Sequence, residues 1–293
     1  MPMAIADDGV ALYCEVTGEG RTLLFIHEFA GDHRSWEAQV RHFSRRYQCV
    51  TYAARGYPPS SVPDDPSSYS QNRAVLDAIA VLDAVGADKA HVVGNSMGGF
   101  TALHLALQFP QRLLSSVAGG CGYGAHPDKE AGFRAECDRL ADAFEQEGAA
   151  SVASWYGTGP ARVQLEVKDP RGHAEHVQLL AEHDAVGSSL TMRGVQRERP
   201  SLYALQEQLA AVTVPMLIVA GDEDDGVLDT DLMLKRSMPS AALTVLPRTG
   251  HLTHLEEPAL FNALVESFLA SVDSGRWKPR DVRSMSTSIT GAK

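Results

Sequence analysis

Gly94 and Gly98 flank Ser96 in a Gly-x-Ser-x-Gly motif, in which the serine hydroxyl can act as a nucleophile. An apolar, β-branched run at 90–93 precedes the motif, and a helix-like run at 100–109 follows it. A sharp turn from strand to helix exposes a serine hydroxyl at the edge of a sheet, with the helix N-terminus behind it. The two glycines lie where a Cβ would collide with the backbone of such a turn. The motif therefore predicts that Ser96 is a nucleophile.

A serine hydroxyl is a poor nucleophile by itself, so it needs a histidine base and an acid that orients the imidazole. Asp224 follows the apolar run 214–220 in the acidic segment Gly-Asp-Glu-Asp-Asp, and His251 follows the run 242–246 in a Gly-His pair. Ser, Asp and His, each just beyond the carboxyl end of a predicted strand, have the chain order of the α/β-hydrolase fold. We therefore expect Ser96, Asp224 and His251 to form a catalytic triad.

Two neighbours remain alternatives to these assignments. A run of acidic residues is typical of a solvated loop, and Asp225 stands next to Asp224 as a second choice of acid. His254 lies three residues after His251 and is a second choice of base.

Hydrophobic patterning predicts the strands and helices that carry these residues. Strands are expected at 10–16, 22–27, 49–53, 90–93, 113–118, 214–220 and 242–246. Between them lie segments with helical spacing of apolar residues, such as 71–85, which ends at a glycine. Alternating strands and helices predict an α/β fold with a mostly parallel central sheet and helices on both faces.

The interval between the strands near 118 and 215 is far longer than an ordinary crossover, so it must hold an inserted element. Its helical periodicity and its Pro and Gly breaks predict a helical cap of roughly four helices over the carboxyl edge of the sheet. We divide the chain into an α/β core at 1–122 and 211–270, a cap at 123–210 and a C-terminal tail at 271–293. The tail is rich in Ser, Thr and basic residues and is expected to be loosely held.

From Leu12 to about Ala270 the chain resembles the α/β-hydrolase superfamily. The resemblance is carried by the Gly-x-Ser-x-Gly elbow, the Gly-Asp-x-Asp acid loop and the pattern from the Gly-His pair to Glu257-Pro258. It implies that the acid is Asp224 and the base His251. The elbow is particularly similar to that of the meta-cleavage-product C–C hydrolases, and many esterases share it.

The resemblance also implies an oxyanion hole formed by the backbone N–H groups of Phe29 and Met97. Where the family usually has His-Gly-x, this chain has His-Glu-Phe, so that Glu28 replaces the glycine. A charged carboxylate ~5 Å from a developing oxyanion would cost roughly 3 kcal/mol at an effective dielectric constant near 20. Glu28 therefore needs an explanation as an auxiliary residue of the site.

Three hypotheses for Glu28 stay open at this point. Its carboxylate could be structural and turn away toward Arg34 or Arg55. Burial could instead keep it protonated, so that it donates a hydrogen bond to the substrate or leaving group. The third hypothesis is that Glu28 binds a cationic or amine-bearing substrate.

Charge and composition restrict the partners. With 26 Lys and Arg against 37 Asp and Glu, the formal net charge is −11, which disfavours nucleic acid and anionic membrane surfaces and favours a small, neutral substrate. The N-terminus has no signal-peptide pattern, and the four cysteines are widely spaced, so we expect a cytoplasmic protein with reduced thiols. No cluster has metal-ligand spacing, and we expect neither a metal nor a cofactor.

These observations predict a serine hydrolase that cleaves a carboxylic ester, lactone or amide of a small apolar or aromatic substrate. Ser96 would attack the carbonyl, His251 would transfer the proton, Asp224 would orient the ring, and water would release the acyl group. Two alternatives remain open: a C–C bond hydrolase of the meta-cleavage-product type, and a non-catalytic ligand-binding receptor with the α/β-hydrolase fold. Assembly as a homodimer is also left open.

Overall fold

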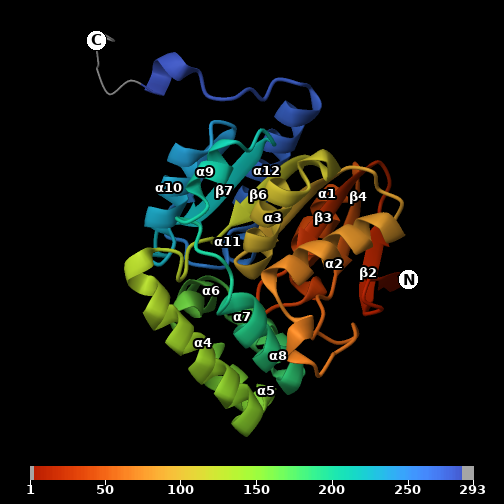
Figure 1. Ribbon diagram of the computed structural model, residues 1–293, viewed down its shortest axis with the longest axis vertical. Coiled ribbons are helices and arrows are strands. Elements are labelled where there is room, and N and C mark those ends of the chain that lie inside the picture. Colours follow the sequence, from red (N-terminus) through yellow and green to blue (C-terminus); the bar gives the residue numbers. More distant parts are fainter. Residues whose placement is uncertain (1–2, 286–293) are drawn as a thin grey trace.

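One sheet runs through the centre of the molecule in the computed structural model, which describes residues 3–285 (Figure 1). Its strand order is β1-β2-β4-β3-β5-β6-β7-β8. The strands are β1 (Met3–Ile5), β2 (Ala11–Thr17), β3 (Arg21–Ile26), β4 (Tyr47–Tyr52), β5 (Ala90–Asn95), β6 (Leu113–Gly119), β7 (Met216–Gly221) and β8 (Ala241–Leu246). From β4 to β8 neighbouring strands are parallel, whereas β1 and β2 pair antiparallel at one edge. The predicted mostly parallel sheet is thus confirmed.

Helices cover both faces of this sheet (Figure 1). The core helices are α1 (Glu37–Phe43), α2 (Gln71–Ala84), α3 (Met97–Gln108), α10 (Leu228–Ser237), α11 (Thr253–Glu256) and α12 (Pro258–Asp273). One apolar layer joins α2, α3 and α10 to the sheet, and a second joins α1 and α12 to the opposite face. Both layers are needed because the central strands are buried on each side, as their continuous apolar runs predict.

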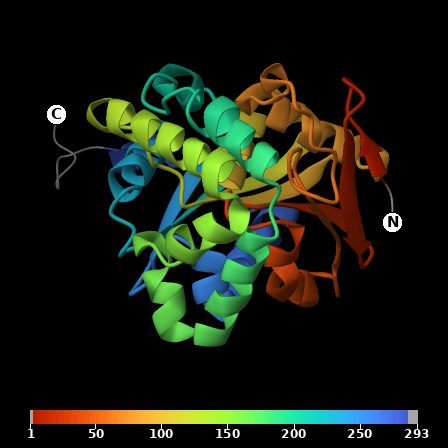
Figure 2. The ribbon, with the colours of Figure 1, turned by 90° about the horizontal axis from the view of Figure 1, so that it is seen from below.

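The long interval after β6 forms the cap. Its helices are α4 (Pro127–Glu147), α5 (Ala149–Tyr156), α6 (Val163–Lys168), α7 (Pro170–Ala181), α8 (Ala185–Leu190) and α9 (Gln206–Ala210), with a π-helical segment at Thr191–Gln196. The long α4 packs against α8, and α5 packs against α7 (Figure 2). In contrast, α9 packs against α10, and its Leu209 belongs to the apolar layer of the core. Among residues 3–285, every helix is too short or too polar to cross a lipid bilayer.

The C-terminal segment after α12 contacts the core through Trp277 and Arg280. The Trp277 ring packs edge-on against Phe268 at 4.7 Å between centroids, and its indole N–H donates to the Ser240 carbonyl at 2.9 Å. The Arg280 N–H donates to the Pro239 carbonyl at 2.8 Å. One aromatic side chain therefore anchors the start of the segment after α12, whereas residues 278–285 are exposed, and the loosely held tail stays a prediction. The rest of that prediction, at 286–293, lies outside the described residues.

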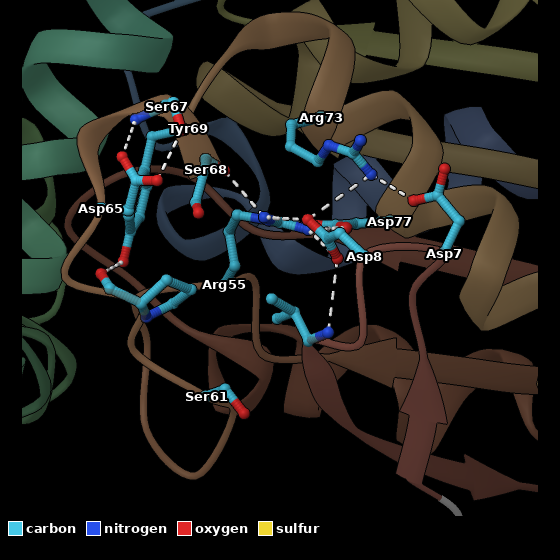
Figure 3. Close-up of polar contacts among 12 residues, drawn as sticks. Asp7, Asp8, Arg55, Ser61, Asp65, Ser67, Ser68, Tyr69, Arg73 and Asp77 are labelled. Carbon is cyan, nitrogen blue, oxygen red and sulfur yellow. Dashed lines mark hydrogen bonds and ion pairs between the residues drawn. The ribbon is translucent and has the colours of Figure 1, made fainter.

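Arg55 forms a buried ion-pair cluster beside α2 (Figure 3). Its Nε and Nη2 atoms each lie 2.6 Å from a carboxylate oxygen of Asp77, and its Nη1 lies 2.9 Å from Asp8. The Arg55 and Asp77 side chains are only 4% and 2% exposed. Removing one partner of such a pair leaves an uncompensated buried charge, which is strongly destabilising.

We expect Asp77→Ala to lower the free energy of unfolding by about 3 kcal/mol, at the low end of the range for broken buried pairs, because Asp8 still contacts the guanidinium. Urea denaturation followed by circular dichroism measures the change. The matched control is Glu37→Ala, which breaks an exposed pair with Arg41 and should leave the midpoint unchanged. An Asp77→Ala midpoint equal to that of the wild type would show that this pair adds no stability.

Candidate active site

The chain turns sharply at Ser96, between β5 and α3. Ser96 has φ +52° and ψ −114°, a strained conformation that non-glycine residues seldom adopt. A Cβ on Gly94 would lie 2.1 Å from the Gly98 carbonyl oxygen, and a Cβ on Gly98 would lie 2.0 Å from the Ile26 carbonyl oxygen. Both contacts are with backbone, so neither position accepts a side chain. This is the local geometry that the Gly-x-Ser-x-Gly spacing predicts for a nucleophile elbow.

Asp224, beyond β7, and His251, beyond β8, meet in a buried hydrogen bond of 2.7 Å between Oδ2 and Nδ1. The second Asp224 oxygen accepts a hydrogen bond of 2.8 Å from the Tyr123 hydroxyl. Burial acts to raise the pKa of Asp224, but the His251 ring and the two hydrogen bonds outweigh it and hold the pKa below its ordinary value. An ionised Asp224 fixes the tautomer in which Nδ1 carries the proton and Nε2 accepts one.

The loop that carries His251 is attached to the elbow. The side-chain amide of Asn95, the residue before Ser96, donates to the His251 carbonyl at 3.1 Å. Ser96 and His251 also line the same cavity. Within residues 3–285, Ser96 Oγ and His251 Nε2 form no hydrogen bond, and catalytic hydrogen bonds are often long before substrate binds. This last link of the triad stays a prediction.

The structure separates the chosen residues from their alternatives. Asp225 is exposed, whereas the buried Asp224 contacts the imidazole. The His254 ring stacks on Trp36 at 4.2 Å between centroids, and burial lowers the pKa of His254 to about 3. Neither alternative lines the cavity that Ser96 and His251 share.

Two residues that support the His251 loop were not found from the sequence. The Tyr123 hydroxyl donates a hydrogen bond to Oδ1 of Asp224, and the Tyr123 ring packs edge-on against the His251 ring at 5.2 Å between centroids. The buried Glu256 carboxylate accepts from the N–H groups of Gly250 and Leu252 at 2.7 and 2.9 Å, and so holds the residues on both sides of His251. A single tyrosine or glutamate carries no spacing signal, so only the folded structure identifies these contacts.

A cavity of about 370 Å³ lies over Ser96, between the core and the cap. Its apolar lining includes Phe29, Leu140, Tyr156 and Met192. Ser96, His251, Tyr123, Glu28, Arg162 and Arg199 supply the main polar groups, and Glu136 and Gln196 also line it. A cavity with a mainly apolar surface and several polar side chains that orient a ligand is typical of small-molecule binding.

The backbone N–H groups of Phe29 and Met97, the predicted oxyanion donors, are free of protein partners. In the described part of the chain neither donates a hydrogen bond to another residue. Met97 is the first residue of α3, where a helix leaves its N–H groups unsatisfied, and the Tyr57 hydroxyl holds the Phe29 carbonyl at 3.0 Å. These amides are therefore available, and their catalytic role stays a prediction.

Glu28 pairs with the cap rather than with the arginines that the sequence suggested. Its Oε2 accepts from the Ala30 N–H at 2.6 Å and lies 3.7 Å from Nη2 of Arg162. Arg34 instead pairs with the buried Asp32 and the exposed Glu182, and Arg55 with the buried cluster of Figure 3. The proposed pairing with Arg34 or Arg55 is therefore wrong. Burial raises the pKa of the Glu28 carboxyl, although Arg162 and the Ala30 N–H oppose the shift.

Comparison with known proteins agrees with this geometry. The family model for the alpha/beta hydrolase fold matches residues 21–258. The chain belongs to the α/β-hydrolase family. This membership confirms the resemblance and the fold class predicted from the sequence, and it places the chain among enzymes that include enol-lactonases, esterases and C–C hydrolases.

Particular relatives cover nearly the whole chain. It is 27% identical to 3-oxoadipate enol-lactonase 1 of Acinetobacter baylyi over 90% of this chain and 95% of that protein. It is 28% identical to 2-hydroxy-6-oxo-6-phenylhexa-2,4-dienoate hydrolase of Burkholderia cepacia over 87% and 89% of the two chains. The crystal structure of the enol-lactonase from Burkholderia xenovorans has a TM-score of 0.80 at 19% identity, with 92% of this chain and 100% of that chain covered. At this identity, the structural likeness shows the fold alone.

Proposed function

We propose that this protein is a serine hydrolase that cleaves a carboxylic ester, lactone or amide of a small substrate with an apolar part. The observation that carries the proposal is the 2.7 Å hydrogen bond between His251 and Asp224 at the wall of a cavity that Ser96 also lines. A lactone or ester is favoured because the chain is similar over nearly its full length to an enol-lactonase.

The proposed reaction uses the triad in two halves. His251 Nε2 takes the Ser96 proton as the hydroxyl attacks the carbonyl carbon, and the oxyanion accepts hydrogen bonds from the N–H groups of Phe29 and Met97. The protonated ring then gives its proton to the leaving group. The leaving group departs, and the acyl group stays bonded to Ser96. Water, deprotonated by His251, attacks this ester and restores the free enzyme. Asp224 stays ionised throughout and stabilises the imidazolium.

A fluorophosphonate probe tests this proposal directly. We expect stoichiometric phosphonylation of the wild-type protein at Ser96, seen by peptide mass spectrometry, because only an activated serine beside an oxyanion hole reacts readily. Ser96→Ala should not be labelled, and Ser151→Ala, which removes an exposed cap serine, should be labelled at the wild-type rate. Wild-type protein that reacts with neither the probe nor p-nitrophenyl acetate would favour a ligand-binding receptor instead.

C–C bond hydrolysis is the second candidate. It is favoured by the elbow, which resembles that of the meta-cleavage-product hydrolases, and by the similarity to the Burkholderia cepacia dienoate hydrolase. A panel of short esters, lactones, anilides and vinylogous diketones, compared by kcat/KM, separates the two candidates. The substrate class with the highest value identifies the bond that the enzyme cleaves.

A further inference from the structure

Two buried arginines line the cavity over Ser96, although the chain as a whole is acidic. Arg162 and Arg199 are 4% and 9% exposed. A buried guanidinium is costly unless a negative charge or strong hydrogen-bond acceptors compensate it. The partners of each arginine therefore indicate whether the cavity has positive charge to offer a substrate.

The charge of Arg162 is balanced inside the protein. Its Nη2 lies 3.7 Å from the Glu28 carboxylate, and its guanidinium lies over the Tyr156 ring at 4.5 Å from the centroid. Glu28 and Arg162 thus form a buried pair between core and cap. Arg162 therefore has a carboxylate partner inside the protein.

Arg199 has no such counter-charge. Within residues 3–285, no carboxylate oxygen lies within 4.0 Å of its guanidinium nitrogens. Its protein acceptors are neutral: Nη2 donates to the Tyr123 carbonyl at 2.5 Å, and Nη1 donates to the Gln196 side chain. Glu136, the other acidic residue at the cavity, is 68% exposed and solvated at the rim. Burial lowers the pKa of Arg199 to about 10, so it remains cationic at neutral pH.

The position of Arg199 fits a contact with the substrate. Its guanidinium stacks on the Phe100 ring at 3.7 Å and faces Phe133 at 4.8 Å. The Phe100 N–H donates to the Ser96 carbonyl, so that Arg199 lies over the helical turn that follows the nucleophile. The stacking covers the faces of the guanidinium plane, while its N–H groups lie along the edge. Two of these groups are used by the protein, and the others can serve a ligand in the cavity.

We infer that Arg199 binds a carboxylate of the substrate, which makes the enzyme selective for esters or lactones of dicarboxylic or oxo acids. The inference builds on the proposed hydrolase function and differs from the expectation of a neutral substrate, which rests on the net charge alone. A carboxylate several bonds from the scissile carbonyl would supply the missing counter-charge. Guanidinium and carboxylate also match in planar, two-point hydrogen bonding.

A pair of esters tests this selectivity. The mono-p-nitrophenyl ester of adipic acid carries a free carboxylate. In the methyl p-nitrophenyl diester of the same acid, this carboxylate is a methyl ester, so the molecule is neutral. We expect the wild type to prefer the anionic ester in kcat/KM. Arg199→Gln should lower kcat/KM for the anionic ester by about 10- to 100-fold, the usual effect of a charge-assisted hydrogen bond, and change the neutral ester by less than about 3-fold. Arg199→Lys should recover part of the preference.

A double variant controls for general damage to the cavity. Glu28→Gln with Arg162→Gln removes both members of the buried pair and leaves Arg199 in place, so the ratio of kcat/KM for the two esters should stay near that of the wild type. A wild type without preference, or an Arg199→Gln variant that loses both activities equally, would overturn the inference.

Binding to an inactive protein separates this inference from the proposed function. Calorimetric titration of Ser96→Ala with adipate should show binding that Arg199→Gln weakens at least about 10-fold. If the wild type hydrolyses neither ester but adipate binding depends on Arg199, then the hydrolase proposal fails and the carboxylate site stands. Adipate binding that is absent, or insensitive to Arg199→Gln, contradicts the site.

Discussion

Ser96→Ala is expected to lower kcat for the best ester or lactone by about 10⁵- to 10⁶-fold, as loss of the nucleophile does in serine hydrolases with a complete triad. The reason is that, among residues 3–285, Ser96 is the only serine or threonine that lines the cavity beside His251. The release of p-nitrophenol, followed by stopped-flow or in the steady state, measures kcat. Contaminating esterases must be removed from the sample first.

The fold of this variant must stay intact for the loss to be interpreted. Alanine keeps the same backbone and removes one oxygen, so the melting temperature should match that of the wild type. A Ser96→Ala variant that keeps more than about a tenth of wild-type kcat would rule out an acyl-enzyme at Ser96, since removing the nucleophile alone should cost far more.

Asp224→Asn is expected to lower kcat by about 10⁴-fold while the protein stays folded, the effect seen when an orienting aspartate becomes an amide. An asparagine can donate its NH₂ to Nδ1 of His251 and so favour the tautomer with the proton on Nε2, which cannot accept the Ser96 proton. The pH profile of kcat should be measured together with its magnitude.

Two neighbours provide matched controls for this prediction. Asp225→Asn changes the adjacent, exposed carboxylate and should leave kcat unchanged. Tyr123→Phe removes one hydrogen bond to Asp224 but keeps the charge of the Asp224 carboxylate. This substitution should therefore lower kcat only about 10-fold. Equal losses from Asp224→Asn and Asp225→Asn would show that the acid has been assigned incorrectly.

The elbow and the acid and base loops could be predicted because each depends on local chemistry. Ser96 needs glycines two residues away on either side, since backbone atoms lie 2.0 to 2.1 Å from where their Cβ atoms would stand. Asp224 and His251 each follow a short apolar run typical of a strand, and the carboxyl ends of parallel strands meet at one edge of the sheet. Short outer elements such as β1 and α1 escaped prediction because they carry too few residues to show a period.

The charged residues of the cavity could not be paired from the sequence. Glu28 was visible as a departure from the family pattern, but its partner Arg162 is 134 positions away in the cap, where helical spacing does not specify which helix faces the core. Arg199 carries no motif, and only its lack of a carboxylate partner in the folded protein sets it apart from the paired arginines. The net charge of the chain does not show the local charge of the cavity, where Arg199 has no carboxylate within 4.0 Å among residues 3–285.

A crystal structure of the fluorophosphonate-treated protein would show whether one serine, one imidazole and two backbone amides converge on a single reacting centre. We predict phosphorus bonded to Ser96 Oγ, with the phosphonyl oxygen about 2.7–3.1 Å from the N–H nitrogens of Phe29 and Met97. His251 Nε2 should lie within about 3.2 Å of Ser96 Oγ or of a phosphonate oxygen. A phosphonate on another residue, or one at Ser96 that His251 does not reach, would contradict the mechanism.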